Sequence, residues 1–292
     1  MKPILSWLGG KRNLLPEISK YYKNLTFNSY FEPFVGGASV FLDIEPSIAT
    51  LSDFNEDLVN MYICIRDCPQ ELIEELMVVD KLFHSEGYYY LRDLFNSDIS
   101  VVKKSACLIG LNKTCFNGVY RVNSSGKFNV PEGRNINPKI ILVEKVLRLS
   151  RILSGKHLIF QDYSEIEVSV KPKDFIYFDP PYQPISKTSS FTNYIGVFDE
   201  ACQLKLFELF KRLDNLGAYV LASNSFCNFI TELYSGYNIE TVHSSRALNS
   251  IGSRRGKVKE VLIAGKTLMK DRGDYFKMLK KRDLDNDMFS YL

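Results

Sequence analysis

Short apolar segments, each about as long as a β-strand, recur along the chain and constrain its fold more than any other feature. Several are apolar throughout, as strands that are covered on both faces of a parallel sheet must be. Helix-like stretches at 38–43, 140–152 and 199–216 lie between them. Because strands that alternate with helices build parallel sheets, we predict an α/β protein with a doubly wound, mostly parallel sheet. The expected strands are 29–34, 48–52, 157–161, 174–178, 219–223 and 260–264.

The stretch 57–139 departs from this alternation. Its first part carries apolar residues such as Leu58, Tyr62 and Ile65 at helical spacing, and its end, 117–134, is a polar loop that contains glycine. We interpret it as a mainly helical insertion between two halves of one α/β domain. That domain then comprises 1–56 and 140–266, and we expect 267–292, which is rich in Lys and Asp, to be a peripheral tail.

The charge of the chain gives little direct information about its partners. It has 37 Lys and Arg residues against 34 Asp and Glu residues, a net charge of +3. Basic residues do crowd one late stretch next to two glycines, which suits a loop that contacts phosphates, although a solvated charged face is the alternative. These residues are Arg246, Arg254, Arg255, Lys257 and Lys259. We select Arg254 and Lys257 among them as candidate DNA contacts.

The cysteines and the apolar runs argue against a metal site and a membrane location. The six cysteines include no Cys-x-x-Cys pair, and the three histidines stand at no ligand-like spacing from them. The first residues lack the apolar core of a signal peptide, and no apolar run reaches the length of a membrane span. We therefore expect no bound metal and a cytoplasmic protein with reduced thiols.

Three predicted strands end in residues that suit a nucleoside pocket. Glu32-Pro33-Phe34-Val35-Gly36-Gly37-Ala38-Ser39 follows the first strand, and its glycines let the backbone turn sharply near a ligand. Asp53 ends the second strand, placed to accept hydrogen bonds from a ribose diol. Asp162 and Tyr163 follow the third strand and offer an acceptor for an adenine amino group and a ring to cover it. A nicotinamide cofactor fits this pattern nearly as well.

The sequence Asp-Phe-Ile-Tyr-Phe-Asp-Pro-Pro-Tyr at 174–182 indicates the chemistry. The exocyclic amine of a nucleobase is a poor nucleophile because its lone pair is delocalised into the ring. Two acceptors aimed at its hydrogens, the Asp179 carboxylate and the Pro180 carbonyl, can release that lone pair, and the prolines hold both acceptors in place. Tyr182 can stack on the base, which must be flipped out of a duplex. The alternative is a diproline turn with a capping aspartate and a core tyrosine.

From residue 6 to about 264 the sequence resembles the deoxyadenosine methylase (Dam) family, the alpha-order N6-adenine DNA methyltransferases. Trp7-Leu8-Gly9-Gly10-Lys11 is similar to the family's Trp-x-Gly-Gly-Lys element, whose Trp and Lys contact S-adenosylmethionine in relatives. The segment 32–39 is similar to its cofactor-binding Glu-Pro-Phe-x-Gly element, although Ala38 stands where relatives often have glycine. Asp53 matches the ribose-binding acid and 179–182 the catalytic Asp-Pro-Pro-Tyr.

This resemblance implies a Rossmann-like methyltransferase fold that binds S-adenosylmethionine and releases S-adenosylhomocysteine. The methyl group would pass in line to N6 of a flipped adenine, without a metal or a covalent intermediate. Double-stranded DNA would be the partner, in the nucleoid of a bacterial or phage-infected cell. Both solitary enzymes and the methylases of restriction–modification pairs fit the pattern, and it sets no oligomeric state.

The resemblance also gives the insertion a role as a target-recognition region, with a DNA-reading hairpin at about 112–135. By this match Arg134 would read a guanine through a bidentate contact, and Arg121 would also contact the target. Val119 would touch a thymine methyl group, and Asn117 would fill space near the displaced base. Asn135 replaces an aromatic residue of relatives, so a wedge is not expected there. The family's commonest target, GATC, is compatible with these residues.

Three other functions remain open on the sequence. An enzyme that methylates an RNA adenine or a protein amide would use a related tetrapeptide on a similar planar nitrogen. A DNA-binding relative without catalysis would keep the fold but has no need for intact Asp179 and Tyr182. A nicotinamide-dependent oxidoreductase would leave the Asp-Pro-Pro-Tyr sequence without an explanation.

Overall fold

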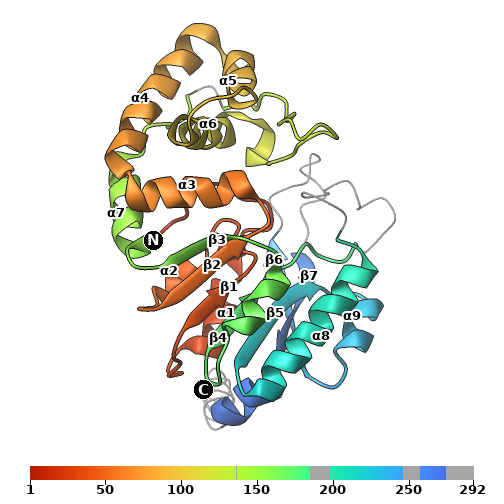
Figure 1. Cartoon of the computed structure of the whole chain (residues 1–292). Coiled ribbons are helices and arrows are strands. Elements are labelled where there is room, and N and C mark those ends of the chain that lie inside the picture. The colour runs from red at the N-terminus through yellow and green to blue at the C-terminus, as the bar shows by residue number, and fades with distance from the viewer. Residues whose placement is uncertain (136, 185–197, 246–256, 274–292) are drawn as a thin grey trace, which may run out of the picture.

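A seven-stranded mixed sheet forms the centre of the protein, as the computed structural model shows for residues 1–135, 137–184, 198–245 and 257–273 (Figure 1). Its strand order is β3-β2-β1-β4-β5-β7-β6, in which β7 runs antiparallel to its neighbours β5 and β6 and the other described pairs are parallel. The strands are β1 (Tyr30–Glu32), β2 (Ala49–Asp53), β3 (His157–Phe160), β4 (Phe175–Phe178), β5 (Tyr219–Ser225), β6 (Asn238–Ser245) and β7 (Lys257–Ala264). The doubly wound, mostly parallel sheet is confirmed, and β6 is a strand that the sequence analysis did not expect.

The strand order reverses between β1 and β4. From β1 the chain adds β2 and β3 on one side, and from β4 it adds β5 on the other. In such sheets the chain segments that follow the two central strands lead away in opposite directions. Ligands bind in the crevice that this leaves outside the carboxyl ends of these strands. The fold therefore marks the ends of β1 and β4 as the place for a site.

Both faces of the sheet are covered, and the residues of β4 alternate between them. Phe175 and Tyr177 belong to the hydrophobic cluster on one face, whereas Ile176 and Phe178 belong to the cluster on the other. The second face packs on α8 (Glu200–Leu216), α9 (Asn228–Leu233) and the 3-10 helix η3 (Tyr163–Val168). The first face packs on α1 (Leu15–Tyr22), which follows the 3-10 helix η1 (Lys11–Asn13), and on α2 (Phe41–Ile44). A strand buried on two faces has to be apolar throughout, which explains the continuous apolar runs in the sequence.

Five further helices lie at the β2–β3 side of the sheet, with α4, α5 and α6 gathered beyond α3 (Figure 1). They are α3 (Glu56–Asp67), α4 (Pro69–Glu86), α5 (Tyr88–Phe95), α6 (Val101–Thr114) and α7 (Val143–Leu153), and α6 leads into the 3-10 turn η2 (Phe116–Gly118). Local signals set their starts: the Asn55 side chain accepts a hydrogen bond from the backbone N–H of Leu58, and Pro69 opens α4. The segment predicted as a helical insertion is therefore helical, as expected.

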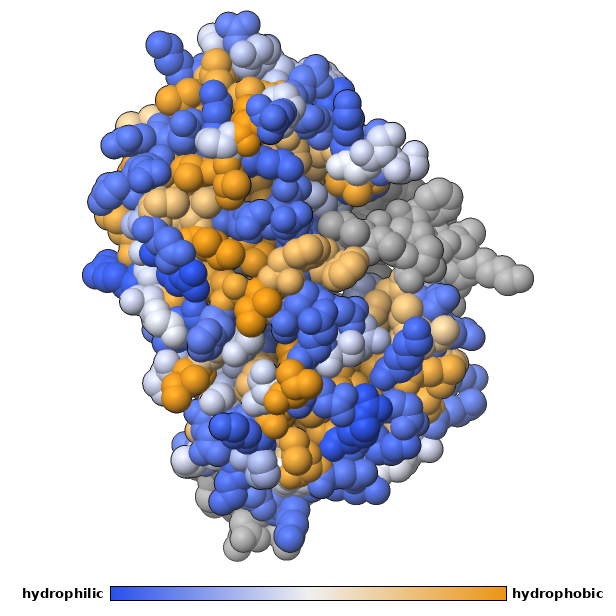
Figure 2. Space-filling model, in the orientation of Figure 1, coloured by the Kyte–Doolittle hydropathy of each residue, from blue (hydrophilic) through white to orange (hydrophobic). Residues whose placement is uncertain are grey.

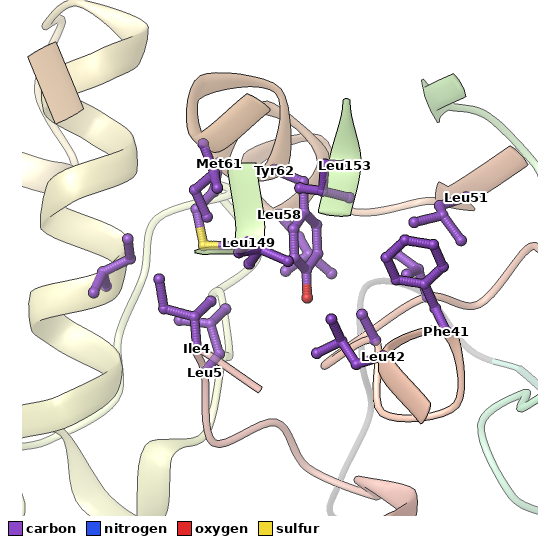
Figure 3. Packing of buried hydrophobic residues seen from close by; sticks show 14 of the residues in the cluster. Ile4, Leu5, Phe41, Leu42, Leu51, Leu58, Met61, Tyr62, Leu149 and Leu153 are labelled. Carbon is purple, nitrogen blue, oxygen red and sulfur yellow. The ribbon is translucent and has the colours of Figure 1, made fainter. Parts of the chain in front are cut away.

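This helical part has no core of its own. One hydrophobic cluster runs from the sheet through α3 and α7 into α4, α5 and α6. Figure 3 shows part of it, with Ile4, Leu5, Phe41, Leu42, Leu51, Leu58, Met61, Tyr62, Leu149 and Leu153 packed together. The division of the chain into a catalytic domain and an insertion stays a prediction, and the packing joins the two parts.

The beginning of the expected peripheral tail is instead part of the packed protein. Residues 266–273 are helical, and Leu268 is fully buried in the cluster that contains α1. The buried Arg272 donates hydrogen bonds to the carbonyls of Lys20 and Lys23 at the end of α1, where helical carbonyls lack partners. Residues 267–273 thus pack on the protein, the tail as a whole stays a prediction, and 274–292 lies outside the described residues.

The surface is that of an ordinary globular protein on the face drawn in Figure 2, where hydrophilic residues surround smaller apolar areas. Within the described part of the chain, no helix combines the length and apolarity that a membrane span needs. The same residues contain no group of three or more His, Cys, Asp or Glu that could hold a metal ion.

Candidate active site

The predicted catalytic aspartate lies where the strand order reverses. Asp179 directly follows β4, and the ammonium of Lys11 is 2.7 Å from its Oδ1 atom. The Ser223 hydroxyl of the adjacent strand β5 donates to the same Oδ1 at 3.0 Å, and Tyr177 shares a 2.9 Å hydrogen bond with Ser223. Burial raises the pKa of Asp179, whereas Lys11 and Ser223 oppose that rise. Asp179 is thus an acceptor with two donors already on one oxygen.

Tyr182 also contacts the Lys11 ammonium. The Lys11 Nζ atom lies 4.6 Å from the centre of the Tyr182 ring, a cation–π arrangement. The Tyr182 hydroxyl donates at 2.8 Å to Oε2 of Glu260, a buried residue of β7. Burial and the nearby carboxylates of Asp179 and Glu260 keep the pKa of Tyr182 well above its ordinary value. The ring is therefore fixed at both its face and its hydroxyl.

The diproline turn between these residues is anchored to α8 and β5. Pro180 is buried, and the Pro181 carbonyl accepts a hydrogen bond from Gln203 Nε2 at 3.0 Å. The Gln203 side chain in turn accepts from Asn224 Nδ2 at 3.0 Å, and Asn224 Oδ1 accepts from the backbone N–H of Gln183. Because proline also limits φ, the turn presents Asp179 and the Pro180 carbonyl in one arrangement.

The glycine turn after β1 is held by residues from two other elements. The Gly36 N–H donates to Asp53 Oδ2 at 3.0 Å, and the Tyr62 hydroxyl of α3 donates to the Gly36 carbonyl at 2.8 Å. Gly36 has a φ of +43°, and a Cβ atom there would lie 2.8 Å from the Trp7 ring. Trp7 therefore packs directly on the turn. Ala38 also has a positive φ, +56°, which explains why α2 begins later than expected and why glycine suits that position.

Two buried carboxyl groups flank this turn. Burial raises the pKa of Asp53 to about 6, and the backbone N–H groups of Gly36 and Asn55 oppose the rise. Burial raises the pKa of Glu32 to about 8, although the Tyr30 hydroxyl and the Phe41 N–H both donate to its Oε2 atom. In this structure Glu32 anchors the start of α2, and its role at a cofactor stays a prediction.

The remaining predicted cofactor residues lie at the same edge of the sheet. Tyr163 stacks on Phe34 with ring centres 5.2 Å apart, and Pro33 and Ser39 are buried within the turn. Asp162 caps η3, because its Oδ1 accepts from the Ser164 N–H at 2.9 Å. A capping carboxylate keeps further acceptor sites, so the adenine contact predicted for Asp162 stays a prediction.

Several residues at the site were not anticipated from the sequence. Ser223 and Glu260 reach Asp179 and Tyr182 from β5 and β7. Phe54 follows the last residue of β2, and Phe160 is the last residue of the neighbouring strand β3. Their ring centres are 5.7 Å apart, and their exposed fractions are 57% and 47%. Phe54 could have been identified from the sequence, because it directly follows Asp53 at the end of a predicted strand and an exposed aromatic ring at a sheet edge suits a planar ligand.

The predicted DNA-reading hairpin rises from the end of α6. Asn117 has a φ of +56° in η2, and Val119 follows it, partly buried against the core. The exposed Arg121 donates from Nε to Asn129 Oδ1 at 2.8 Å across the hairpin. Arg134 is also exposed and lines a cavity of about 360 Å³. The other residues around that cavity are Ser6, Asn112, Lys113, Cys115, Asn117, Gly118 and Asn135.

Asn117 and Arg134 are thus brought together at one cavity, whereas Arg121 lies along the hairpin. Of the late basic residues, Arg254 lies outside the described part, and Lys257 is the first residue of β7. Tyr120 links the hairpin to the glycine turn, since its ring lies 5.7 Å from Trp7 and its hydroxyl donates to Asp57 of α3.

Comparisons with known proteins agree with this geometry. Residues 7–248 match the family model described as D12 class N6 adenine-specific DNA methyltransferase. The chain is 38% identical to a type II methyltransferase of Lactococcus lactis subsp. cremoris, M1.LlaDCHI, over 90% of this chain and 95% of that protein. It is 39% identical to the type II methyltransferase M.MjaIII of Methanocaldococcus jannaschii, over 90% and 98%. A DNA adenine methylase of Vibrio cholerae is 32% identical over 89% and 95%. The chain therefore belongs to the D12 class of N6 adenine-specific DNA methyltransferases.

Proposed function

We propose that the protein transfers the methyl group of S-adenosylmethionine to N6 of an adenine that is flipped out of duplex DNA, and that its target is GATC. Membership of an adenine-specific DNA methyltransferase family favours DNA over RNA or a protein amide, and favours a methyl donor over a nicotinamide cofactor. GATC is the target implied by the resemblance of the hairpin at 112–135 to that of the deoxyadenosine methylases.

The observation that carries the proposal is the arrangement of donors on Asp179. An ammonium N–H group lies 2.7 Å from its Oδ1 atom, so the carboxylate accepts hydrogen bonds from nitrogen at this edge of the sheet. An adenine amino group presents the same kind of donor, with a second N–H for the neighbouring Pro180 carbonyl. Acceptors fixed in advance, in a site with little water, lower the barrier most where charge develops in the transition state.

The residues around the glycine turn fit S-adenosylmethionine. Asp53 offers a buried carboxylate for a ribose diol beside the backbone of Gly36, while the exposed rings of Phe54 and Phe160 flank the place for an adenine. Trp7 packs against Gly36 and Gly37 of this turn. The bound cofactor supplies an electrophilic methyl group, and its product is S-adenosylhomocysteine.

The enzyme's own residues then position the base. A target adenine has to leave the base stack, which costs a few kcal/mol, and stacking on an aromatic ring offsets part of that cost. Tyr182 is suited to this contact because Glu260 fixes its hydroxyl and leaves the ring as the contact surface. We assign the choice of target to Asn117, Val119, Arg121 and Arg134, with Arg254 and Lys257 as further DNA contacts.

The experiment is sequencing of modified bases in DNA from methylation-deficient bacteria that express the protein. We expect N6-methyladenine at essentially every GATC and at no other recurrent sequence. The matched control is a strain that expresses Asp179→Ala at the same level, in which the modification should be absent. Methylation confined to another short sequence would overturn the GATC assignment alone, whereas unmodified DNA with folded, abundant protein would overturn the proposed activity.

A further inference from the structure

Asn112, in the last turn of α6, is a buried side chain that holds two separate segments at once. Its exposed fraction is 6%. Its Oδ1 atom accepts from the Ser6 N–H at 2.8 Å, and its Nδ2 atom donates to the Ser6 carbonyl at 3.0 Å and to the Gly118 carbonyl at 2.8 Å. One side-chain amide thus satisfies both backbone groups of Ser6 and one backbone group of Gly118.

The two segments carry different parts of the proposed machinery. The first continues from Ser6 through Trp7 to Lys11, whose ammonium contacts Asp179. The second continues from Gly118 into the hairpin residues assigned to target recognition. Asn112 stands at the start of the stretch 112–135 that the resemblance assigns to DNA reading, but it was not among the residues given a contact with DNA or cofactor there.

The segments also touch each other directly. Gly118 has a φ of +64°, and a Cβ atom there would lie 2.9 Å from the Ser6 carbonyl oxygen, so only glycine permits this approach. The Trp7 and Tyr120 rings lie 5.7 Å apart, and Ser6, Asn112 and Gly118 line the same cavity as Arg134. A displacement of the segments relative to each other would therefore leave the buried Gly118 carbonyl, or the part-buried Ser6 carbonyl, without its donor, which is unfavourable.

We propose that Asn112 is a positioning residue that couples cofactor binding to DNA binding. This inference rests on the proposed function, because it takes 6–11 as part of the cofactor site and 117–134 as part of the DNA site. Contact of the cofactor with Trp7 fixes the position of the first segment. Because Asn112 is hydrogen-bonded to both Ser6 and Gly118, Gly118 is then fixed relative to Ser6, and the hairpin that follows it is ordered for DNA binding. By linkage, DNA must strengthen cofactor binding by the same factor as the cofactor strengthens DNA binding.

The test measures this factor in both directions without catalysis. S-adenosylhomocysteine binding is followed through the fluorescence of Trp7, the only tryptophan of the chain, with and without a short duplex that contains one GATC. Duplex binding is followed by anisotropy, with and without S-adenosylhomocysteine. In the wild-type protein each ligand should tighten the other by about 5-fold or more. In Asn112→Asp, which keeps the acceptor for Ser6 but loses both donated bonds, both factors should fall towards one.

Asn96→Asp is the matched control. Asn96 holds the backbone of Phe128, accepting from its N–H at 2.7 Å and donating to its carbonyl at 3.0 Å, and so makes a similar amide clamp on the hairpin. It does not touch the segment that carries Trp7, so its loss should weaken DNA binding at most and leave the coupling factor at the wild-type value. Equal loss of coupling in both variants would show a general effect of a loosened hairpin and would overturn the inference.

A second variant keeps the inference testable if Asn112→Asp does not fold. Gly118→Ala leaves Asn112 intact but forces Ser6 and Gly118 apart, and it too should lower the coupling factor. Wild-type coupling in the folded variants, or a factor of one in a wild-type protein that binds both ligands, would overturn the role of Asn112. A wild-type protein that binds no S-adenosylhomocysteine would instead contradict the proposed function.

Discussion

At the scale of single residues, Asp179 has both a proposed chemical role and a structural one. Its carboxylate pairs with the buried Lys11 ammonium and accepts from Ser223, so it also stabilises the local structure. We expect Asp179→Ala to lower turnover by at least about 100-fold, by analogy with removal of one fixed polar partner in other active sites. A tritiated-methyl assay at saturating DNA measures this, with circular dichroism as the check on folding. Near-normal methylation by the folded variant would contradict the mechanism.

Glu32 gives a prediction about pH and stability. Burial raises its pKa from an ordinary value of 4.5 to about 8, so the folded protein binds a proton more tightly than the unfolded chain between these pH values. The contribution of Glu32 to the free energy of unfolding is therefore present at pH 4.5 and is lost as the pH rises to 8. Each unit of pKa difference corresponds to about 1.4 kcal/mol.

Glu32→Gln removes this titration but keeps an oxygen that can accept from Tyr30 and Phe41. Relative to the wild-type protein, the variant should therefore gain stability as the pH rises from 5 to 8. Urea unfolding of both proteins at the two pH values measures the difference. A constant difference between them would show that Glu32 has the same pKa in the folded and unfolded states.

The sequence predicts part of the site at the residue scale, for a physical reason. Asp53 and Asp179 end or follow apolar strands, and the carboxyl ends of parallel strands lie at one edge of the sheet, so their proximity to that edge could be inferred. Ser223 and Glu260 could not be placed in this way, because they reach the site only through the order β4-β5-β7. That order depends on pairing between strands that are distant in the sequence.

At the scale of structural elements, the hairpin at 112–135 allows a test of target recognition. Arg134 is exposed beside the cavity that Asn117 also lines, which suits a contact with a base edge. Arg134→Ala should cost roughly 1–3 kcal/mol of binding and relax discrimination at one base position. Arg151→Ala, on an exposed position of α7, removes the same charge and should leave discrimination unchanged. Equal effects of both changes across a panel of one-base-substituted duplexes would reduce Arg134 to a general electrostatic role.

Strands that are buried on two faces were the easiest elements to predict. β4 and β5 are apolar or small over most of their length because helices cover both faces. β6 was missed because Asn238–Ser245 is a largely polar strand at the edge of the sheet, paired with β7, and Asn238, Thr241 and His243 are exposed. Such a segment resembles a loop in composition, and only its antiparallel partner makes it a strand.

The hydrophobic cluster decides how the whole molecule should unfold. An inserted region with a separate core could melt independently of the sheet. Here buried residues of α4, α5 and α6 belong to the same cluster as residues of β2, β4, α3 and α7. Figure 3 shows the part of this cluster that α3, α7 and β2 contribute. Loss of packing in the helical part therefore removes contacts from the part that carries Trp7, which makes the two parts energetically dependent.

Leu76→Ala tests this dependence, because Leu76 is fully buried in α4, far along the chain from Trp7. The change should cost about 2–5 kcal/mol, the range for truncation of a buried leucine. Since the core is shared, urea unfolding followed by Trp7 fluorescence and by helical circular dichroism should shift together, with coincident midpoints. Met77→Ala, at the neighbouring position with an exposed fraction of 49%, should shift neither signal appreciably. A lower midpoint in circular dichroism alone would mean that the helical part unfolds as an independent unit.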